Sequence, residues 1–356
     1  MPDLFTPLRI RDVELRSRIM VSPMCQYSSQ DGLANDWHLV HLGSRAVGGA
    51  ALVMVEATAV TPEGRISPMD MGLWNDAQIA PLQRIFSFMS AQGAVPAIQL
   101  AHAGRKASTA VPWKGGHPLS PEEGGWSPIA GPSRLPFTEK HQVPEAITPQ
   151  QIAAIAGSFA EATRRAIAAG ARVVEIHAAH GYLLNSFLSP LSNQRVDEYG
   201  GSFVNRTRIL REVVAAVRQV WPEKYPLFLR ISASDWTEGG WTADESVDLA
   251  RMLKTEGVDV FDCSSGGNIA TAKIPLGPGY QVPFAEKLRR EAGVMTAAVG
   301  MITEPKQADQ IIRTGQADLV VMAREFLRDP YWPLHAARTL GHDLPWPPQY
   351  ERAKPK

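Results

Sequence analysis

Eight short apolar segments recur along the chain, each about as long as a buried β-strand. They are rich in Val, Ile and Leu and show no polar alternation, which is typical of strands that are covered on both faces of a parallel sheet. These segments span residues 19–21, 51–55, 95–100, 172–176, 227–231, 258–262, 295–299 and 319–322. Helical patterns follow most of them. Eight strands alternating with helices predict an α/β fold of the (β/α)8 TIM-barrel type.

Four of the intervening helices carry their own start and stop signals. Each begins at a capping residue or a Pro, or ends at a Gly or Pro after the last turn. The predicted helices cover residues 148–170, 205–221, 242–257 and 303–315. Their spacing agrees with one helix between successive barrel strands.

Two segments lie outside this alternation. Residues 5–16, within the N-terminal stretch 1–17, carry two short apolar runs that predict a hairpin plugging the bottom of the barrel. Residues 108–145, after the third strand, are rich in Pro, Gly and Trp and have no helical period. A loop of this length is usually a functional lid or disordered, and its aromatic residues favour an ordered flap. The chain 1–356 is interpreted as a single domain.

Composition narrows the class of protein. The 356 residues include 36 Lys and Arg against 36 Asp and Glu, which argues against binding to nucleic acid or a membrane surface. Two cysteines, Cys25 and Cys263, are too few for a disulfide framework or a four-thiolate metal site. No apolar stretch approaches the length of a membrane span and no secretory signal is recognisable. The expected protein is globular and cytoplasmic.

Candidate chemistry lies where the predicted strands end, because barrels of this type build their active sites from those loops. His177 and His180 follow the fourth strand, and residues three apart on a strand face one ligand only if the chain turns between them. Gly181 makes such a turn plausible. The pair is open to three interpretations: zinc ligands, structural histidines, or hydrogen-bond donors to a substrate oxygen. We favour donors because no carboxylates or thiolates complete a metal shell. Tyr182 is equally a proton donor or a packed core residue.

The loops after the seventh and eighth strands indicate a phosphorylated ligand. Gly300 permits close backbone approach and Arg324 offers charge-assisted hydrogen bonds, and barrels often bind phosphate in these two loops. An ordinary salt bridge of Arg324 is the alternative. No GxGxxG follows a first strand, so a Rossmann-type dinucleotide site is not expected.

Five motifs together resemble the Old Yellow Enzyme family of FMN-dependent ene-reductases. They occupy residues 22–27, 99–106, 177–183, 197–202 and 324–330. The Cys25 and Tyr27 pair and the tail at 348–352 are similar to the subgroup of YqjM and xenobiotic reductase A. Yeast-like members carry Thr in place of Cys25 and Asn in place of His180.

The resemblance implies an NADPH dehydrogenase of the ene-reductase type. NADPH or NADH would reduce non-covalently bound FMN, which would then reduce the C=C bond of an α,β-unsaturated carbonyl or nitro compound. FMN would contact residues from most strand ends, namely Ser22, Pro23, Met24, Cys25, Ala57, Gln99, His177, Arg230, Gly300, Ala323 and Arg324. No metal is expected.

The same resemblance assigns the catalytic residues. His177 and His180 would bind the substrate oxygen, Tyr182 would protonate the α-carbon, and Tyr27 would add a hydrogen bond. Cys25 would bind substrate and tune the flavin potential without covalent attack. Lys106, at the rim, would meet the nicotinamide phosphate or the flavin, unless it is simply solvated. Arg352, in the tail 345–356, would enter a neighbouring site in a homodimer or homotetramer.

Two rival functions remain open on the residues alone. One is a metal-dependent hydrolase that uses His177 and His180, and the other is a barrel that binds a flavin or phosphate without catalysis. Larger relatives with an iron–sulfur cluster are excluded because no cysteine follows Cys263.

Overall fold

The computed structural model describes residues 1–355. Eight parallel strands form a closed barrel in chain order, with the last strand pairing back to the first. They are β3 (Ile19–Val21), β4 (Leu52–Ala59), β5 (Val95–Ala101), β8 (Val173–Ala178), β9 (Leu227–Ser232), β10 (Val260–Ser264), β11 (Met295–Ala298) and β12 (Leu319–Met322). The predicted (β/α)8 barrel is therefore confirmed.

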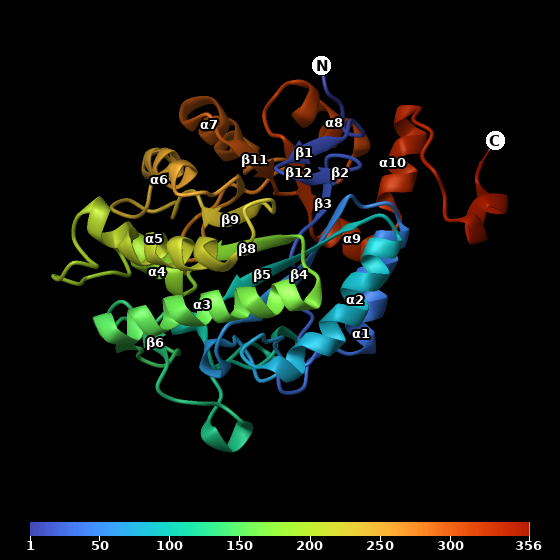
Figure 1. The fold of residues 1–356 in the computed structure, drawn as a ribbon. Helices are drawn as coiled ribbons and strands as arrows, with labels where there is room; N and C mark the ends of the chain where they lie inside the picture. The colour runs from blue at the N-terminus through green and yellow to red at the C-terminus, as the bar shows by residue number, and fades with distance from the viewer. Residues whose placement is uncertain (356) are drawn as a thin grey trace.

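Helices surround this barrel (Figure 1). The helices are α1 (Asp36–Val47), α2 (Ile79–Ala91), α3 (Pro149–Ala169), α4 (Leu183–Leu188), α5 (Phe203–Val220), α6 (Ala243–Thr255), α7 (Val282–Ala292), α8 (Pro305–Arg313), α9 (Arg324–Arg328) and α10 (Trp332–Leu340). The capping signals of α3 and α6 work as predicted: Thr148 and Thr242 each accept a backbone N–H. Helix α5 begins two residues earlier than predicted because Ser202 caps it.

Most strand boundaries differ from the prediction by one or two residues, and two strands differ most. Strand β4 continues through the polar residues after Val55, where a bulge at Ala57 shifts the register. Strand β10 runs from Val260 to Ser264 instead of 258–262. Just before it, the Asp259 side chain binds Arg11 and Arg218 at the foot of the barrel. Asp262 lies within the strand, not at its end, and is fully buried.

The barrel interior changes from apolar to polar along the strands. The floor consists of buried residues such as Ala97, Val173, Phe228 and Val260. The hairpin of β1 (Leu8–Ile10) and β2 (Val13–Leu15) packs against this floor, which confirms the plug. Because side chains alternate along a strand, the next inward positions lie two residues further on. These positions hold Gln99, Glu175, Arg230 and Asp262, all buried.

The predicted flap follows η3 (Gly104–Lys106). It contains the short turns η4 (Pro112–Lys114) and η5 (Pro121–Glu123), and its strand β6 (Ala130–Gly131) pairs with β7 (Glu145–Ala146). Figure 1 shows its tip projecting from the body. The flap reaches the barrel mouth through Trp113, whose ring meets Tyr27 edge-on at 5.9 Å. Phe137 lies beneath the Lys106 ammonium, 3.9 Å from it.

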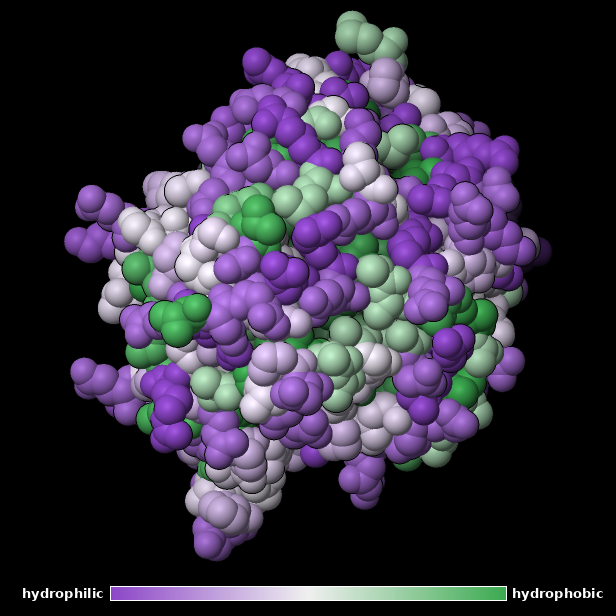
Figure 2. Space-filling view, turned by 60° about the vertical axis from the view of Figure 1, so that its left-hand side comes forward, coloured by the Kyte–Doolittle hydropathy of each residue, from purple (hydrophilic) through white to green (hydrophobic). Residues whose placement is uncertain are grey.

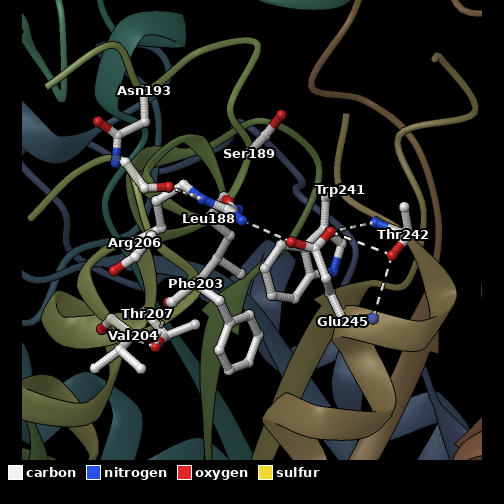
Figure 3. Close-up of polar contacts among 12 residues, drawn as sticks. Leu188, Ser189, Asn193, Phe203, Val204, Arg206, Thr207, Trp241, Thr242 and Glu245 are labelled. Atoms are coloured by element: carbon white, nitrogen blue, oxygen red, sulfur yellow. Dashed lines mark hydrogen bonds and ion pairs between the residues drawn. The ribbon is translucent and has the colours of Figure 1, made fainter. Parts of the chain in front are cut away.

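A buried arginine fixes the segment after the fourth barrel strand. Arg206 on α5 donates to the carbonyl of Leu188, at the end of α4, and to Glu245 Oε1 at 2.6 Å (Figure 3). The other oxygen of Glu245 accepts the N–H of Thr242 at 3.0 Å and completes the cap of α6. Helix α4 is thereby tied to α5 and α6, and α4 begins directly after Tyr182.

The molecular surface is mixed. On the face shown in Figure 2, hydrophilic residues predominate and hydrophobic residues are scattered among them in small groups. Among the helices of residues 1–355, none has both the length and the apolar character needed to cross a bilayer.

Candidate functional site

The two predicted site histidines lie at the C-terminal end of β8. The chain turns as the spacing required: His180 and Gly181 both have positive φ, 61° and 75°. Glycine is needed at 181, because a Cβ there would lie 2.4 Å from the carbonyl oxygen of Gly267. The turn brings the rings of His177 and His180 to 5.2 Å, nearly perpendicular. Both side chains therefore share one site.

Both imidazoles are neutral at neutral pH. Burial, together with the positive charge of Arg230, lowers the pKa of His177 and of His180 well below the ordinary value. His177 Nδ1 accepts the N–H of Ala179 at 3.2 Å, so its proton is on Nε2. His180 Nε2 lies 2.6 Å from Ser264 Oγ on β10. The site thus offers a neutral imidazole donor at His177 and a second neutral imidazole, His180, whose ring is held by Ser264.

Tyr182 completes this group. Its ring stands perpendicular to that of His177 at 5.0 Å. Burial, with the nearby Cys25 and Asp70, raises the pKa of Tyr182 well above its ordinary value, so the side chain is a phenol that can donate a proton.

Cys25 and Tyr27 lie in the loop after β3. Burial and the carboxylates of Glu56 and Asp70 raise the pKa of the Cys25 thiol well above its ordinary value. Burial also raises the pKa of Tyr27. A thiol held protonated is a poor nucleophile, which agrees with the expectation that Cys25 does not attack substrate.

Lys106 is held by backbone at the rim of the mouth. Its ammonium donates to the carbonyls of His180 and Gly267, and burial lowers its pKa to about 7. The neighbouring Arg105 donates to Asn268 at 2.6 and 2.8 Å. Turn η3 therefore joins the His180 turn to the loop after β10. Contact of Lys106 with a nicotinamide or a flavin stays a prediction.

A separate cavity of about 350 Å³ opens between the ends of β9 to β12. Its lining includes three predicted phosphate or flavin residues together with Arg230, namely Gly300, Ala323 and Arg324. Gly300 has a φ of +123°, a conformation that residues with a side chain rarely adopt, and a Cβ there would lie 3.0 Å from the Gln281 side chain. Arg230 is buried and donates to Ser22 Oγ at 2.9 Å.

The remaining predicted residues are placed as follows. Ala57 is buried and Pro23 and Met24 are half-buried near the mouth, while Gln99 donates to Glu175 inside the barrel at 2.8 Å. Arg352 is exposed in η6 (Pro348–Ala353), on a tail that extends away from the barrel (Figure 1). The chain does not bring Arg352 to its own mouth. Of the predicted tail 345–356, Lys356 lies outside the described residues.

Sequence reasoning missed Ser264, Gln281 and the interior pair of Glu175 with Asp262. Ser264 contacts His180, and Gln281 accepts from Ser265 at 2.7 Å. The signal for Asp262 and Ser264 was the polar end of the sixth apolar segment, where Asp262 and Cys263 are followed by two serines. Within residues 1–355, no group of three or more His, Cys, Asp and Glu side chains is arranged to hold a metal ion.

Comparison with known proteins identifies the family. The model of the NADH:flavin oxidoreductase / NADH oxidase family matches residues 3–343. The chain belongs to this family, the Old Yellow Enzyme family. An NADPH dehydrogenase of Bacillus licheniformis is 49% identical over 352 residues, covering 98% of both chains. That of Geobacillus thermodenitrificans is 48% identical, with the same coverage.

Solved structures agree with this membership. Morphinone reductase is 27% identical and superposes with a TM-score of 0.79, over 96% of this chain and 91% of that one. The barrel of 2-naphthoyl-CoA reductase gives a TM-score of 0.85 at 24% identity and shows the shared fold. Our chain spans 52% of that longer protein.

The cofactor of this Old Yellow Enzyme family member is FMN, with a reduced nicotinamide as reductant. The residues at the mouth fit such a group. Two cations, Arg230 and Arg324, line the cavity into which Gly300 permits backbone approach. Arg230 would lie near the flavin ring and Arg324 near the phosphate, where each cation offsets negative charge.

Proposed function

We propose that the protein is an ene-reductase that uses NADPH or NADH to reduce the C=C bond of α,β-unsaturated carbonyl or nitro compounds. The observation that carries this proposal is the perpendicular pair of neutral imidazoles beside the Tyr182 phenol. Two donors for one oxygen and a separate proton source are what reduction of a polarised alkene requires. The names of the relatives, NADPH dehydrogenase and morphinone reductase, support an NADPH-linked reduction.

In the proposed mechanism, some of these side chains stabilise negative charge on the substrate oxygen and another supplies the proton. FMN, when bound, supplies hydride exchange with the nicotinamide and with the alkene. His177, through Nε2–H, and His180 bind the substrate oxygen, where negative charge develops as hydride reaches the β-carbon. Tyr182 then gives its proton to the α-carbon, so the product has gained one hydride and one proton across the former double bond. Tyr27 donates a further hydrogen bond to the substrate oxygen.

The flavin contacts follow from the same placement. Ser22, Pro23, Met24, Cys25 and Ala57 would line one side of the ring, and Gln99 and Arg230 would face its polar edge. Ala57 leaves room because it is small, and Arg230 favours negative charge on the reduced ring. Gly300, Ala323 and Arg324 would hold the phosphate. The pair of Cys25 and Tyr27 supports a place in the YqjM-like subgroup.

The visible spectrum tests this proposal directly. The purified protein is expected to be yellow or to take up FMN, to lose its flavin absorbance when mixed anaerobically with NADPH, and to regain it on adding cyclohexenone. A colourless protein that takes up no FMN would contradict the proposal. Flavin that NADPH reduces but cyclohexenone does not reoxidise would favour a function other than alkene reduction.

We propose further that the enzyme is a homodimer or a homotetramer in which Arg352 enters the neighbouring site. The exposed tail that carries Arg352 supports this, because it extends away from its own barrel (Figure 1). Arg352→Ala is expected to raise KM for the enone by roughly tenfold, the value of one charged hydrogen bond, with little change in kcat. Glu351→Ala, in the same exposed turn, is the matched control. Equal KM values in both variants and the wild type would leave Arg352 without this function.

A further inference from the structure

Two buried carboxyl groups lie one layer below the mouth, inside the barrel. Glu175 on β8 and Asp262 on β10 are both fully buried. Arg230 on β9, between them, pairs in register with Asp262, and its Nε lies 3.5 Å from Asp262 Oδ2. Gln99 donates to Glu175 Oε1 at 2.8 Å. This carboxyl pair is separate from the imidazoles and the phenol that would meet the substrate.

The carboxyl pair is poorly satisfied by its surroundings. Among the described residues, neither oxygen of Asp262 nor Oε2 of Glu175 has a hydrogen-bond partner, and neither does Nε of Arg230. A buried anion that lacks hydrogen-bond partners is costly, by several kcal/mol. The groups that act on the pair are the Arg230 guanidinium, which is 3.5 Å from Asp262 and whose charge acts on both carboxyls, and the Gln99 amide, which donates to Glu175. Glu56 is engaged elsewhere, by His38 at 3.0 Å.

The net charge of Glu175, Asp262 and Arg230 depends on whether the carboxyl pair holds a proton. With both carboxyls ionised, the cluster of two anions and Arg230 carries −1 in a buried layer, whereas one proton on the pair makes the cluster neutral. Burial and the neighbouring Asp262 raise the pKa of Glu175 to about 8, and burial raises that of Asp262. A raised pKa means that the proton is present at neutral pH and is lost as the pH rises through about 8.

We propose that Glu175 and Asp262 share one proton, and that this proton sets the charge that Arg230 presents to the bound cofactor. The second half rests on the placement of FMN above Arg230 proposed in the preceding section. With the proton in place, the cluster of Glu175, Asp262 and Arg230 beneath the flavin carries no net charge. Without it, the cluster is negative and disfavours negative charge on the reduced flavin. Reduction of the flavin therefore draws a proton to the pair when the pH is high enough to have removed it.

The shared proton can be observed without activity. In the oxidised holoenzyme, the infrared difference spectrum between low and high pH is expected to contain a protonated carboxyl band lost as the pH rises through about 8. Glu175→Gln and Asp262→Asn are each expected to abolish this band, because the single carboxyl left beside Arg230 stays ionised. Asp70→Asn is the control: burial raises the pKa of this carboxyl, which is not part of the pair, to about 7, so its substitution should remove another band and leave the pair's intact.

Two infrared outcomes would overturn the sharing of a proton. One is a wild-type spectrum without the band. The other is a band that survives in either Glu175→Gln or Asp262→Asn, which would give the proton to one residue alone. A protein that fails to bind FMN would overturn the proposed function. The same infrared titration of the FMN-free protein would still decide whether Glu175 and Asp262 share a proton.

The link to the cofactor is tested by the midpoint potential of bound FMN as a function of pH. Above about pH 8, the wild type is expected to take up one proton more per two-electron reduction than Glu175→Gln. Identical pH slopes in the wild type and Glu175→Gln would show that the pair does not act on the flavin.

Discussion

Replacing His177 and His180 together by alanine is expected to lower kcat/KM for cyclohexenone by at least about 10²–10³-fold, the usual cost of losing a donor to a developing oxyanion. Both rings are neutral because burial and Arg230 lower the pKa of each, so they act as hydrogen-bond donors and not as cations. FMN should remain bound, since Arg230 and the Gly300 cavity are unchanged. Steady-state kinetics and the flavin absorbance measure the two effects, and binding of a phenol, which mimics the substrate oxygen, should be lost.

Single variants distinguish the loss of a hydrogen-bond donor from the loss of side-chain packing. His180→Asn keeps a donor of similar reach and is expected to recover much of the activity that His180→Ala loses. His335→Ala, on the exposed side of α10, is the matched control and should leave turnover unchanged. Wild-type turnover in the double alanine variant would refute the assignment of the oxygen-binding site. Because both pKa values are lowered, neither ring should introduce a fall in rate as the pH drops from 8 to about 6.

Tyr182→Phe is expected to lower the rate of cyclohexenone reduction by about 10²–10⁴-fold, the range for a positioned general acid. The rate at which NADPH bleaches the flavin should not change, because that step needs no proton at the α-carbon. Rapid mixing of each substrate with the enzyme measures the two rates separately. The raised pKa of Tyr182 keeps the phenol protonated at neutral and mildly alkaline pH, so this group should cause no alkaline loss of rate there.

Tyr27→Phe provides the comparison for Tyr182→Phe. Tyr27 would bind the substrate oxygen without giving up its proton, so its loss is expected to raise KM by roughly tenfold and to affect kcat less. Equal losses of kcat in both variants would contradict the separate roles of the two phenols. An unchanged rate in Tyr182→Phe would mean that water delivers the proton.

Local signals in the sequence predicted most of the barrel. Eight apolar segments without polar alternation can be buried only between two layers, and caps such as Thr148 define helix ends through a few neighbouring atoms. Tertiary contacts that no local pattern encodes lie where β10 differs from its prediction. Arg11, from the hairpin, and Arg218 bind Asp259, just before the strand begins. Asp262, which the prediction put at the last position of the strand, lies within it and is buried.

The sequence predicted those residues of the candidate site that lie at the ends of barrel strands. His177 and Tyr182 lie at the end of β8, Arg230 lies on β9 and Arg324 follows β12, and the barrel brings the ends of these three strands to one mouth. The orientation of His180 depended on a left-handed backbone turn packed against Gly267, far away in the chain. The sequence predicts Lys106 only as a residue at the rim of the mouth. In the structure, its ammonium donates to the carbonyls of His180 and Gly267, which are far away in the chain.

The sequence by itself determined the barrel, the family and the set of chemical groups at the mouth, because periodicity, capping and motifs are properties of neighbouring residues. Only the tertiary structure decided how these groups are charged. The pKa values of His177, Tyr182 and Glu175 depend on burial and on charges from other strands. The pairing of Glu175 with Asp262 across Arg230 joins three strands, and no pattern along one strand encodes it.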